Sequence, residues 1–409
     1  MPIPYWTVIP FVLLLIAIAC SPLLAPHIWE SNRSKALVTF SCALPILCWL
    51  LVDDPAALRH TALDYASFIC LLGSLFVISG DIAVTGDLRA TPAVNTAFLA
   101  VGALLANLIG TTGASMVLIR SFLRTNSERQ HTRHLPVFFI FIVSNCGGML
   151  TPLGDPPLFL GYLRGVPFFW TITLFPIWAV ATGALLVAFY CWDRIAYARE
   201  GPQALALDRA RIRPLRFEGG INLLFLAGVL AAVFLPSPGR ELLMIAMAAA
   251  SLRLGPNVAR RLNRFTWGPI VEVAILFAGI FITMVPALEL LRANAPAFGL
   301  SKPWHFFWTT GILSSLLDNA PTYLTFLAVA QGLNLPADLV GVPEALLRAI
   351  SVGAVLMGAN TYIGNGPNFM VKAIADHAGF HTPSFLGYMR YAVMVLFPIY
   401  FLVHWIFLS

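Results

Sequence analysis

The sequence predicts an all-α polytopic membrane protein made of two inverted repeats, each with five transmembrane spans (one broken) and a re-entrant hairpin. Of the 409 residues, 59% are hydrophobic and 11% are charged, whereas soluble proteins carry about 25% charged residues. The apolar segment 136–163 is long enough to cross a bilayer, yet its centre is rich in Gly, Pro and polar residues. A second segment of this kind follows in the other half of the chain.

The two interrupted segments align with each other. Residues 151–159 read TPLGDPPLF and residues 361–369 read TYIGNGPNF, so that Asp155 pairs with Asn365. Proline removes a backbone donor and glycine disfavours a continuous helix, which predicts two half-helices joined by unwound backbone in each segment. Such backbone survives at membrane depth only where it is buried in protein or lines a cavity. A weaker match of residues 104–107 with 316–319 follows the same order and favours a duplication.

The predicted organisation is a first repeat, a cytoplasmic basic linker and a second repeat. The first repeat covers 1–192, with its hairpin at 94–119 and its broken helix at 136–163. The linker covers 193–218. The second repeat covers 219–409, with a hairpin at 305–330 and a broken helix at 346–374. The remaining predicted spans are 5–24, 35–52, 62–82 and 167–191, then 221–235, 241–252, 269–291 and 385–408.

Arginine distribution predicts the orientation. Arginines gather in segments 120–134, 193–218 and 253–264, and positively charged loops stay in the cytoplasm. These segments share one side only if 94–119 makes an even number of crossings, as a hairpin or two short spans would. The N-terminus is then expected outside the inner (plasma) membrane of a bacterium, and an odd number of crossings in the first repeat inverts the second.

Polar side chains concentrate at the predicted hairpin tips and in the broken helices. Asp155 and Asp318 are carboxylates expected near the midplane, where a charge is costly unless it is paired or functional. Carboxylate, carbonyl and hydroxyl oxygens suit alkali or alkaline-earth ions, and a carboxylate also carries a proton, so both residues are predicted metal ligands, with sodium among the candidate ions. The other predicted ion- or substrate-binding residues are Asn107, Thr111, Thr112, Ser144, Asn145, Thr151, Asn319, Thr322, Asn360, Thr361, Asn365 and Asn368. The ordinary structural alternative for each is a helix cap or a polar contact between packed helices.

At these residues the chain resembles the ion transporter superfamily, which includes NhaD-type sodium/proton antiporters, citrate and dicarboxylate carriers, and the arsenite permease. Residues 144–155, SNCGGMLTPLGD, are similar to the antiporters' Ser-Asn-Ala-Gly-Gly…Pro-Ile-Gly-Asp stretch, and residues 318–321, DNAP, to their Asp-Asn-x-Pro. The resemblance implies a homodimer that works by an elevator motion. It also implies ion-site roles for Ser144, Asn145, Asp155, Asp318 and Asn319.

Two departures bear on the substrate. The antiporters carry Ala-Asp-Asn in the first hairpin, where this chain has Leu105, Ala106 and Asn107. Residues 360–368, NTYIGNGPN, look more like the anion-carrying relatives, whose site is built from amides, hydroxyls and helix ends. The superfamily is therefore better supported than any one substrate.

The first predicted function is sodium/proton antiport by alternating access. The alternative is sodium- or proton-coupled transport of a small anion such as citrate or a dicarboxylate. An enzyme is not expected: an intramembrane aspartyl protease requires Gly-x-Gly-Asp, and position 152 is Pro. A channel is disfavoured because broken inverted repeats suit alternating access. The expected partners are membrane lipid, a small ion or anion and a second copy of the chain. No nucleic acid is expected, and no cofactor besides the coupling sodium ion or proton.

Overall fold

The computed structural model describes residues 3–29, 31–255 and 257–409. The chain is 77% helical, and seven helices of the described part are long and apolar enough to cross a membrane. The protein is therefore an all-α polytopic membrane protein, as the composition predicts.

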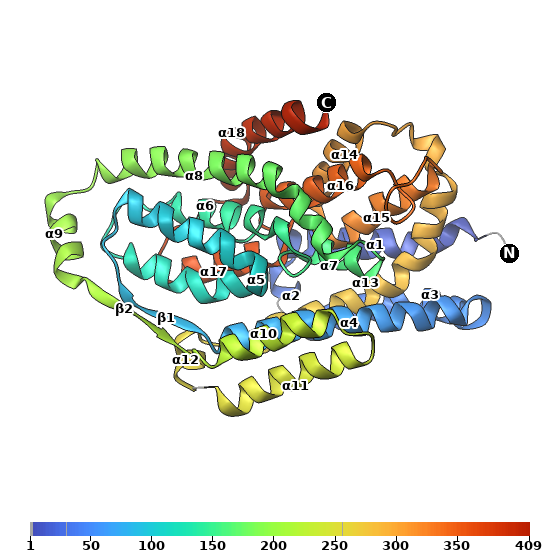
Figure 1. The fold of residues 1–409 in the computed structure, drawn as a ribbon, viewed down its shortest axis with the longest axis horizontal. Helices are drawn as coiled ribbons and strands as arrows, with labels where there is room; N and C mark the ends of the chain where they lie inside the picture. Colours follow the sequence, from blue (N-terminus) through green and yellow to red (C-terminus); the bar gives the residue numbers. More distant parts are fainter. Residues whose placement is uncertain (1–2, 30, 256) are drawn as a thin grey trace.

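The helices run along the chain in the order shown in Figure 1. Those before residue 212 are α1 (Val8–Leu24), α2 (Pro26–Trp29), α3 (Asn32–Asp53), α4 (Pro55–Gly80), α5 (Pro92–Thr125), α6 (Leu135–Ile142), α7 (Pro156–Leu163), α8 (Phe175–Tyr197) and α9 (Pro202–Arg211). Those after it are α10 (Asn222–Val233), α11 (Gly239–Leu254), α12 (Asn257–Leu262), α13 (Gly268–Ala293), α14 (Pro303–Leu316), α15 (Asn319–Gly332), α16 (Glu344–Met357), α17 (Gly366–His377) and α18 (Phe385–Val403). Short helical turns lie between some of them, including η2 (Cys146–Leu150) and η5 (Gly358–Asn360).

The long helices form two layers. In the first, α13 packs against α1, α3 and α4, and α4 packs against α10 and α11; we call it the α4–α13 layer. The second holds α5–α8 and α14–α18, with α14 on α16, α17 on α5 and α18 on α8; we call it the broken-helix layer. The two layers meet where α13 contacts α15 and α4 contacts α5 (Figure 1).

Helix α5 doubles back on itself. At Gly110 the backbone has φ 76° and ψ 155°, a conformation essentially confined to glycine. Near the two ends of α5, the amides of Asn95 and Asn126 exchange hydrogen bonds of 2.8 and 2.9 Å. Residues 92–125 therefore form two antiparallel arms with a tip at Gly110, and the predicted hairpin 94–119 lies within them.

Each interrupted segment contains two helical arms separated by unwound backbone. The first runs through α6, η2 and α7, and the second through α16, η5 and α17. In the first, a Cβ on Gly154 would overlap the carbonyl oxygen of Gly148; in the second, a Cβ on Gly364 would lie 2.6 Å from the carbonyl oxygen of Gly358. The glycines therefore permit a close backbone crossing at the centre of each segment.

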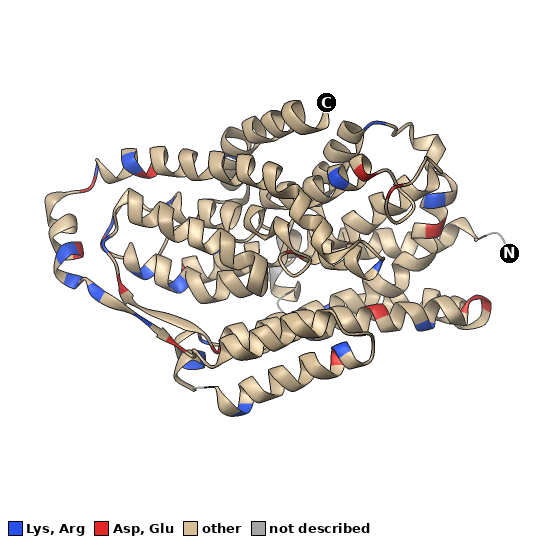
Figure 2. Ribbon diagram, in the orientation of Figure 1, with Lys and Arg blue, Asp and Glu red and all other residues tan. Residues whose placement is uncertain are grey.

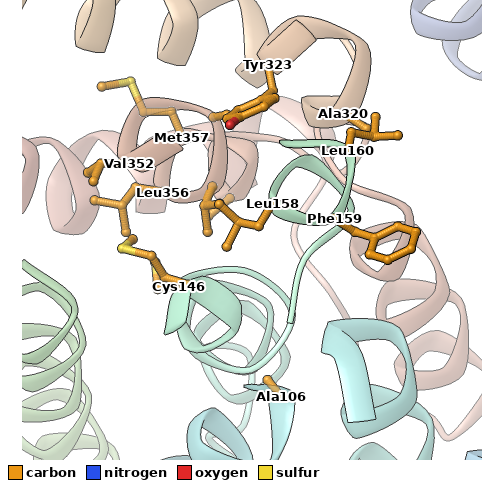
Figure 3. Packing of buried hydrophobic residues seen from close by; sticks show 14 of the residues in the cluster. Ala106, Cys146, Leu158, Phe159, Leu160, Ala320, Tyr323, Val352, Leu356 and Met357 are labelled. Atoms are coloured by element: carbon orange, nitrogen blue, oxygen red, sulfur yellow. The ribbon is translucent and has the colours of Figure 1, made fainter. Parts of the chain in front are cut away.

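Apolar side chains hold these interrupted segments together. Figure 3 shows Cys146 of η2 beside Leu356 of α16, with Leu158 of α7 close by. Cys146, Leu158 and Leu356 are each 2% exposed or less, so the unwound backbone lies inside a packed core, as backbone at membrane depth must.

The linker holds more regular structure than the sequence predicts. Residues 193–197 continue α8, residues 202–211 form α9, and β2 (Arg213–Glu218) pairs antiparallel with β1 (Ala83–Asp87). Strands this short and polar carry too little alternation for a sequence pattern to detect. The result is a two-stranded ribbon that joins the linker to the segment between α4 and α5 (Figure 1).

Two predicted spans of the second half correspond to short helices. Helices α10 and α11 have 12 and 16 residues, fewer than the ~20 residues of a straight crossing. The five crossings of the second repeat, and the inverted relation between the repeats, stay predictions. Charged residues lie mostly toward helix ends and connections (Figure 2), and Lys35, which is buried near the start of α3, pairs with Glu272 near the start of α13 at 2.7 Å.

Candidate functional site

The carboxylate of Asp155 lies in the middle of the broken-helix layer and is 1% exposed. Its Oδ1 accepts hydrogen bonds from Thr111 Oγ1 at 3.2 Å and from Asn365 Nδ2 at 2.9 Å. Its Oδ2 accepts one from Asn319 Nδ2 at 2.6 Å. These donors come from the tip of α5 and the starts of α17 and α15, so the two interrupted segments and both hairpins converge on one side chain.

The partners of Asp155 are all neutral. Within the described part of the chain, no Lys, Arg or His forms an ion pair with it. Asn319 Oδ1 is also buried and has no hydrogen-bond partner among the described residues. Helices α7, α15 and α17 begin here, and helix N-terminal ends carry partial positive charge. The arrangement is a set of hard oxygens suited to a sodium ion or a proton, beside amide and helix-end donors suited to an anion.

A second set of amides joins the two interrupted segments. Asn365 Nδ2 lies 3.2 Å from both Asn145 Oδ1 and Ser144 O, and Asn145 Nδ2 donates to Asn368 Oδ1 at 2.7 Å. Asn368 in turn donates to the carbonyls of Gly358 and Thr361 at 2.9 Å. The hydroxyl of Ser144 bonds that of Ser115 at 2.8 Å. The predicted residues Ser144, Asn145 and Asn368 therefore support the Asp155 cluster.

A cavity of about 80 Å³ adjoins this cluster at the boundary between the layers. Apolar side chains of α4 and α13, including Leu75, Ile270 and Phe277, form one wall. The opposite wall includes Thr111, Thr112, Gly154, Asp318, Asn365 and Gly366. The two predicted carboxylates thus differ in position: Asp318 lines the cavity, whereas Asp155 is bonded to the lining residues Thr111 and Asn365 and does not itself line it.

The Asp318 carboxylate has a structural partner as well. It accepts a hydrogen bond of 3.0 Å from the backbone N–H of Ala320 and so caps α15. Thr322, one turn further on, donates to the carbonyl of Asp318 at 2.9 Å. Asp318 is half-buried, which leaves it in contact with the cavity and with its helix.

The remaining predicted residues anchor backbone. Thr151 donates to the carbonyl of Asn107 at 2.5 Å, and Thr361 donates to the carbonyl of Ser315 at 2.6 Å. Asn107 Nδ2 also donates to Gly147 O at 2.7 Å. These bonds tie each hairpin to its neighbouring interrupted segment.

The paired threonine anchors correct one sequence alignment. The sequence pairs residues 104–107 with 316–319, which makes Asn107 the counterpart of Asn319. The threonine bonds instead make Ser315 the counterpart of Asn107, and the same spacing then makes Asn319 the counterpart of Thr111. The sequence match pairs the hairpins at an offset of 212 positions (316 − 104), whereas the threonine bonds give 208 (315 − 107) and the interrupted segments are offset by 210 (361 − 151).

Sequence reasoning missed several polar residues of the region. Ser315 accepts from Asn360 Nδ2 at 2.8 Å, and Tyr400 donates to Asn360 Oδ1 at 2.9 Å. Asn360 therefore lies against α14 and α18 rather than on Asp155. Ser315 opens the segment that contains Asp318 and could have been found there, whereas Tyr400 lies in an apolar span without any local signal.

Comparison with known proteins decides the family. A family model described as "Putative citrate transport" matches residues 1–408. The chain belongs to this citrate transport family. The family is one of transporters, not of enzymes. The match favours the citrate and dicarboxylate side of the resemblance drawn from the sequence and gives no particular support to the NhaD-type antiporters.

A curated relative agrees with the membrane assignment. This member of the citrate transport family is 28% identical, over 277 residues, to a "46 kDa membrane protein" of Mycobacterium leprae (strain TN). The aligned region covers 62% of this chain and 62% of that protein. The chain therefore spans less than two thirds of the length of that relative.

Proposed function

We propose that the protein is a secondary transporter that moves a small carboxylate anion, of the citrate or dicarboxylate class, together with a sodium ion or proton. The observation that carries this proposal is the Asp155 cluster, in which a buried carboxylate is bonded only by neutral donors. An anion alone would be repelled by an ionised Asp155. A cation or proton bound there removes that repulsion, which supports coupled transport.

The proposed cation ligands are oxygens on three side chains that hydrogen bonds join to one another. Asp155 supplies the charge, and the unpaired Oδ1 of Asn319 and the hydroxyl of Thr111 lie on groups bonded to it. Sodium prefers such hard oxygen ligands. The anion would then lie in the cavity, against the start of α17 at Gly366 and the start of α7 at Pro156, where N-terminal helix ends favour negative charge.

The two-layer arrangement supports an elevator-type cycle. All hydrogen bonds of the Asp155 cluster lie within the broken-helix layer, and the facing wall of α4 and α13 is apolar. The broken-helix layer can therefore carry the cluster past the α4–α13 layer as one unit. A homodimer in a bacterial inner membrane, with the N-terminus outside, completes the proposal.

Sodium/proton antiport is the second candidate function. It is favoured by two carboxylates, Asp318 in the lining of the cavity and Asp155 in the adjoining cluster, and by a described lining that includes no Lys or Arg. In that case a proton and a sodium ion would compete for Asp155, and no anion would be carried.

One reconstitution experiment separates the two candidates. Purified protein in liposomes is given labelled citrate, succinate or malate under an inward sodium gradient and, separately, an inward proton gradient. The same vesicles, loaded with a pH dye, receive pulses of Na⁺, Li⁺ and K⁺ without an anion. Gradient-driven anion uptake supports the first proposal. Proton movement on a cation pulse with no anion uptake would replace it with antiport, and silence in both assays would count against both.

A further inference from the structure

A second pocket, of about 390 Å³, opens among the arginine-rich connections and, within the described residues, shares no lining residue with the Asp155 cavity. Its cationic or titratable side chains include His131, Arg133, Arg199 and His381. They come from the loop before α6, the segment after α8 and the loop between α17 and α18. Both halves of the chain therefore line one pocket, and its two arginines come from the first half.

The two carboxylates that pair with His134 and His131 of this pocket, Asp193 and Glu200, also have other partners. Asp193 accepts hydrogen bonds from Asn95 at 3.0 Å and forms an ion pair with Arg129 at 2.7 Å. Glu200 accepts from the backbone N–H groups of Gln130 and His131, each at 2.9 Å. By contrast, neither Arg133 nor Arg199 has an ion-pair partner anywhere in the described part of the chain.

Aromatic side chains place the pocket at the edge of the apolar region. Trp192 of α8 and Tyr391 of α18 line it, and their ring centroids are 5.2 Å apart. Both residues lie within helices that are long and apolar enough to span a membrane. Ile195, also in the lining, is 58% exposed. Trp and Tyr in such positions commonly lie at the level of lipid headgroups.

We propose that this pocket binds a phosphate-bearing anion through Arg133 and Arg199. Guanidinium groups bind phosphate oxygens with paired, charge-assisted hydrogen bonds. Basic pockets between membrane helices bind anionic lipid headgroups in the same way. The anion is either such a headgroup, with Trp192 and Tyr391 beside the glycerol region, or a soluble phosphate. By contacting α8 and α18 together, it links the two halves of the chain.

Binding is measured on the full-length protein in a neutral maltoside detergent. The probes are dioctanoyl phosphatidylglycerol, dioctanoyl phosphatidylcholine and inorganic phosphate, each titrated by calorimetry. The pocket variant is Arg133→Ala/Arg199→Ala, and a second variant, Arg133→Lys/Arg199→Lys, keeps the charge. The control is Arg194→Ala/Arg390→Ala, which removes one exposed arginine of α8 and one of α18, neither of which lines the pocket. Elution as a single symmetric peak in size-exclusion chromatography establishes that each variant is folded.

We expect saturable binding of phosphatidylglycerol or of inorganic phosphate to the wild type, weakened about tenfold or more in the alanine pocket variant and by less than about twofold in the control. The lysine variant should fall between them. Binding of phosphatidylglycerol alone identifies a lipid headgroup; equal binding of inorganic phosphate identifies a soluble anion. The proposal is overturned if neither phosphatidylglycerol nor inorganic phosphate binds saturably. It is also overturned if phosphatidylcholine binds as tightly as phosphatidylglycerol while inorganic phosphate does not bind. A control variant that loses as much affinity as the alanine pocket variant would overturn it as well.

Discussion

Asn365 donates a 2.9 Å hydrogen bond to Asp155 across 210 positions of sequence. The two residues occupy matching places in the chain. Asp155 lies in TPLGDPPLF at the start of α7, and Asn365 lies in TYIGNGPNF at the start of α17. One segment thus supplies a charge and the other an amide that bonds it. The amide nitrogen of Asn carries two N–H donors, so Asn365 Nδ2 can donate to Asp155 Oδ1 and to Asn145 Oδ1 together.

Replacing Asp155 with Asn tests the charge without changing side-chain size. We expect coupled transport to fall about 100-fold or more, because a charged ligand contributes about 3 kcal/mol and each 1.4 kcal/mol is a factor of ten. The measurement is gradient-driven uptake in liposomes. Asp53→Asn, an exposed carboxylate at the end of α3, is the matched control. Unchanged cation dependence in Asp155→Asn would remove this residue from the site.

Replacing Asn319 with Leu tests the unpaired oxygen. Leu has a similar size but supplies neither the donor to Asp155 nor the free Oδ1. We expect the cation KM to rise about tenfold or more, since a lost bond to a charged group costs about 1.5–3 kcal/mol. Thr325→Val is the control, because the hydroxyl of Thr325, on the same helix, donates to the carbonyl of Pro321 at 2.8 Å. Equal effects in both variants would mean that the assay reports a disturbance of helix α15 and not the loss of Asn319 Oδ1.

Replacing Gly154 with Ala tests the backbone crossing of the first interrupted segment. A Cβ there overlaps the carbonyl oxygen of Gly148, so the variant is expected to lose about 2 kcal/mol or more of stability. Gly183→Ala, in α8, is the control, since among the described residues nothing lies within 4 Å of the added Cβ. Thermal unfolding in detergent compares the two. A Gly154→Ala protein as stable as Gly183→Ala would contradict the close crossing.

The β-ribbon gives the protein a pH-dependent contribution to stability. Burial, together with the nearby carboxylates of Glu128 and Asp208, raises the pKa of Asp87 from its ordinary 3.8 to about 6. The folded protein therefore binds this proton more tightly than the unfolded chain. The resulting stabilisation is complete below about pH 4 and is lost as the pH rises through about 6.

Asp87→Asn keeps the neutral form at every pH. Above about pH 7 we expect the variant to be more stable than the wild type by about 1 kcal/mol, a value reduced for solvent screening because Asp87 is only half-buried. Below about pH 4 the two proteins should converge. Melting temperatures across this range measure the difference. Curves that stay parallel at every pH would show that Asp87 does not titrate in this range.

The sequence predicts which polar residues lie in the site better than it predicts which of them contact one another. Asp155 and Asn365 stand out because Pro, Gly and charge are unexpected in an apolar span, and both do meet in the structure. The bond from Asn319 to Asp155 joins residues 164 positions apart, and no local pattern encodes such a contact. Asn360 shows the converse limit: residue type marks it as polar, but the direction of its side chain, toward Tyr400, depends on tertiary packing.

In the fold, too, local features are predicted from the sequence and contacts between distant segments are not. Long apolar helices follow directly from composition and hydropathy. The ribbon of β1 and β2 does not, because its pairing of Thr85 with Arg216 lies between distant polar segments. The reversal at Gly110 is intermediate: glycine there indicates a turn, but only the contact of Asn95 with Asn126 demonstrates that the arms are antiparallel.

The apolar wall of α4 and α13 has a mechanical consequence. Leu75, Ile270 and Phe277 offer the facing cavity neither donors nor acceptors, so moving the Asp155 cluster along them exchanges no hydrogen bonds of that cluster. The resistance to such a movement then depends on the shape and bulk of these side chains. Enlarging or trimming them should change how fast the protein turns over while leaving what it selects unaltered.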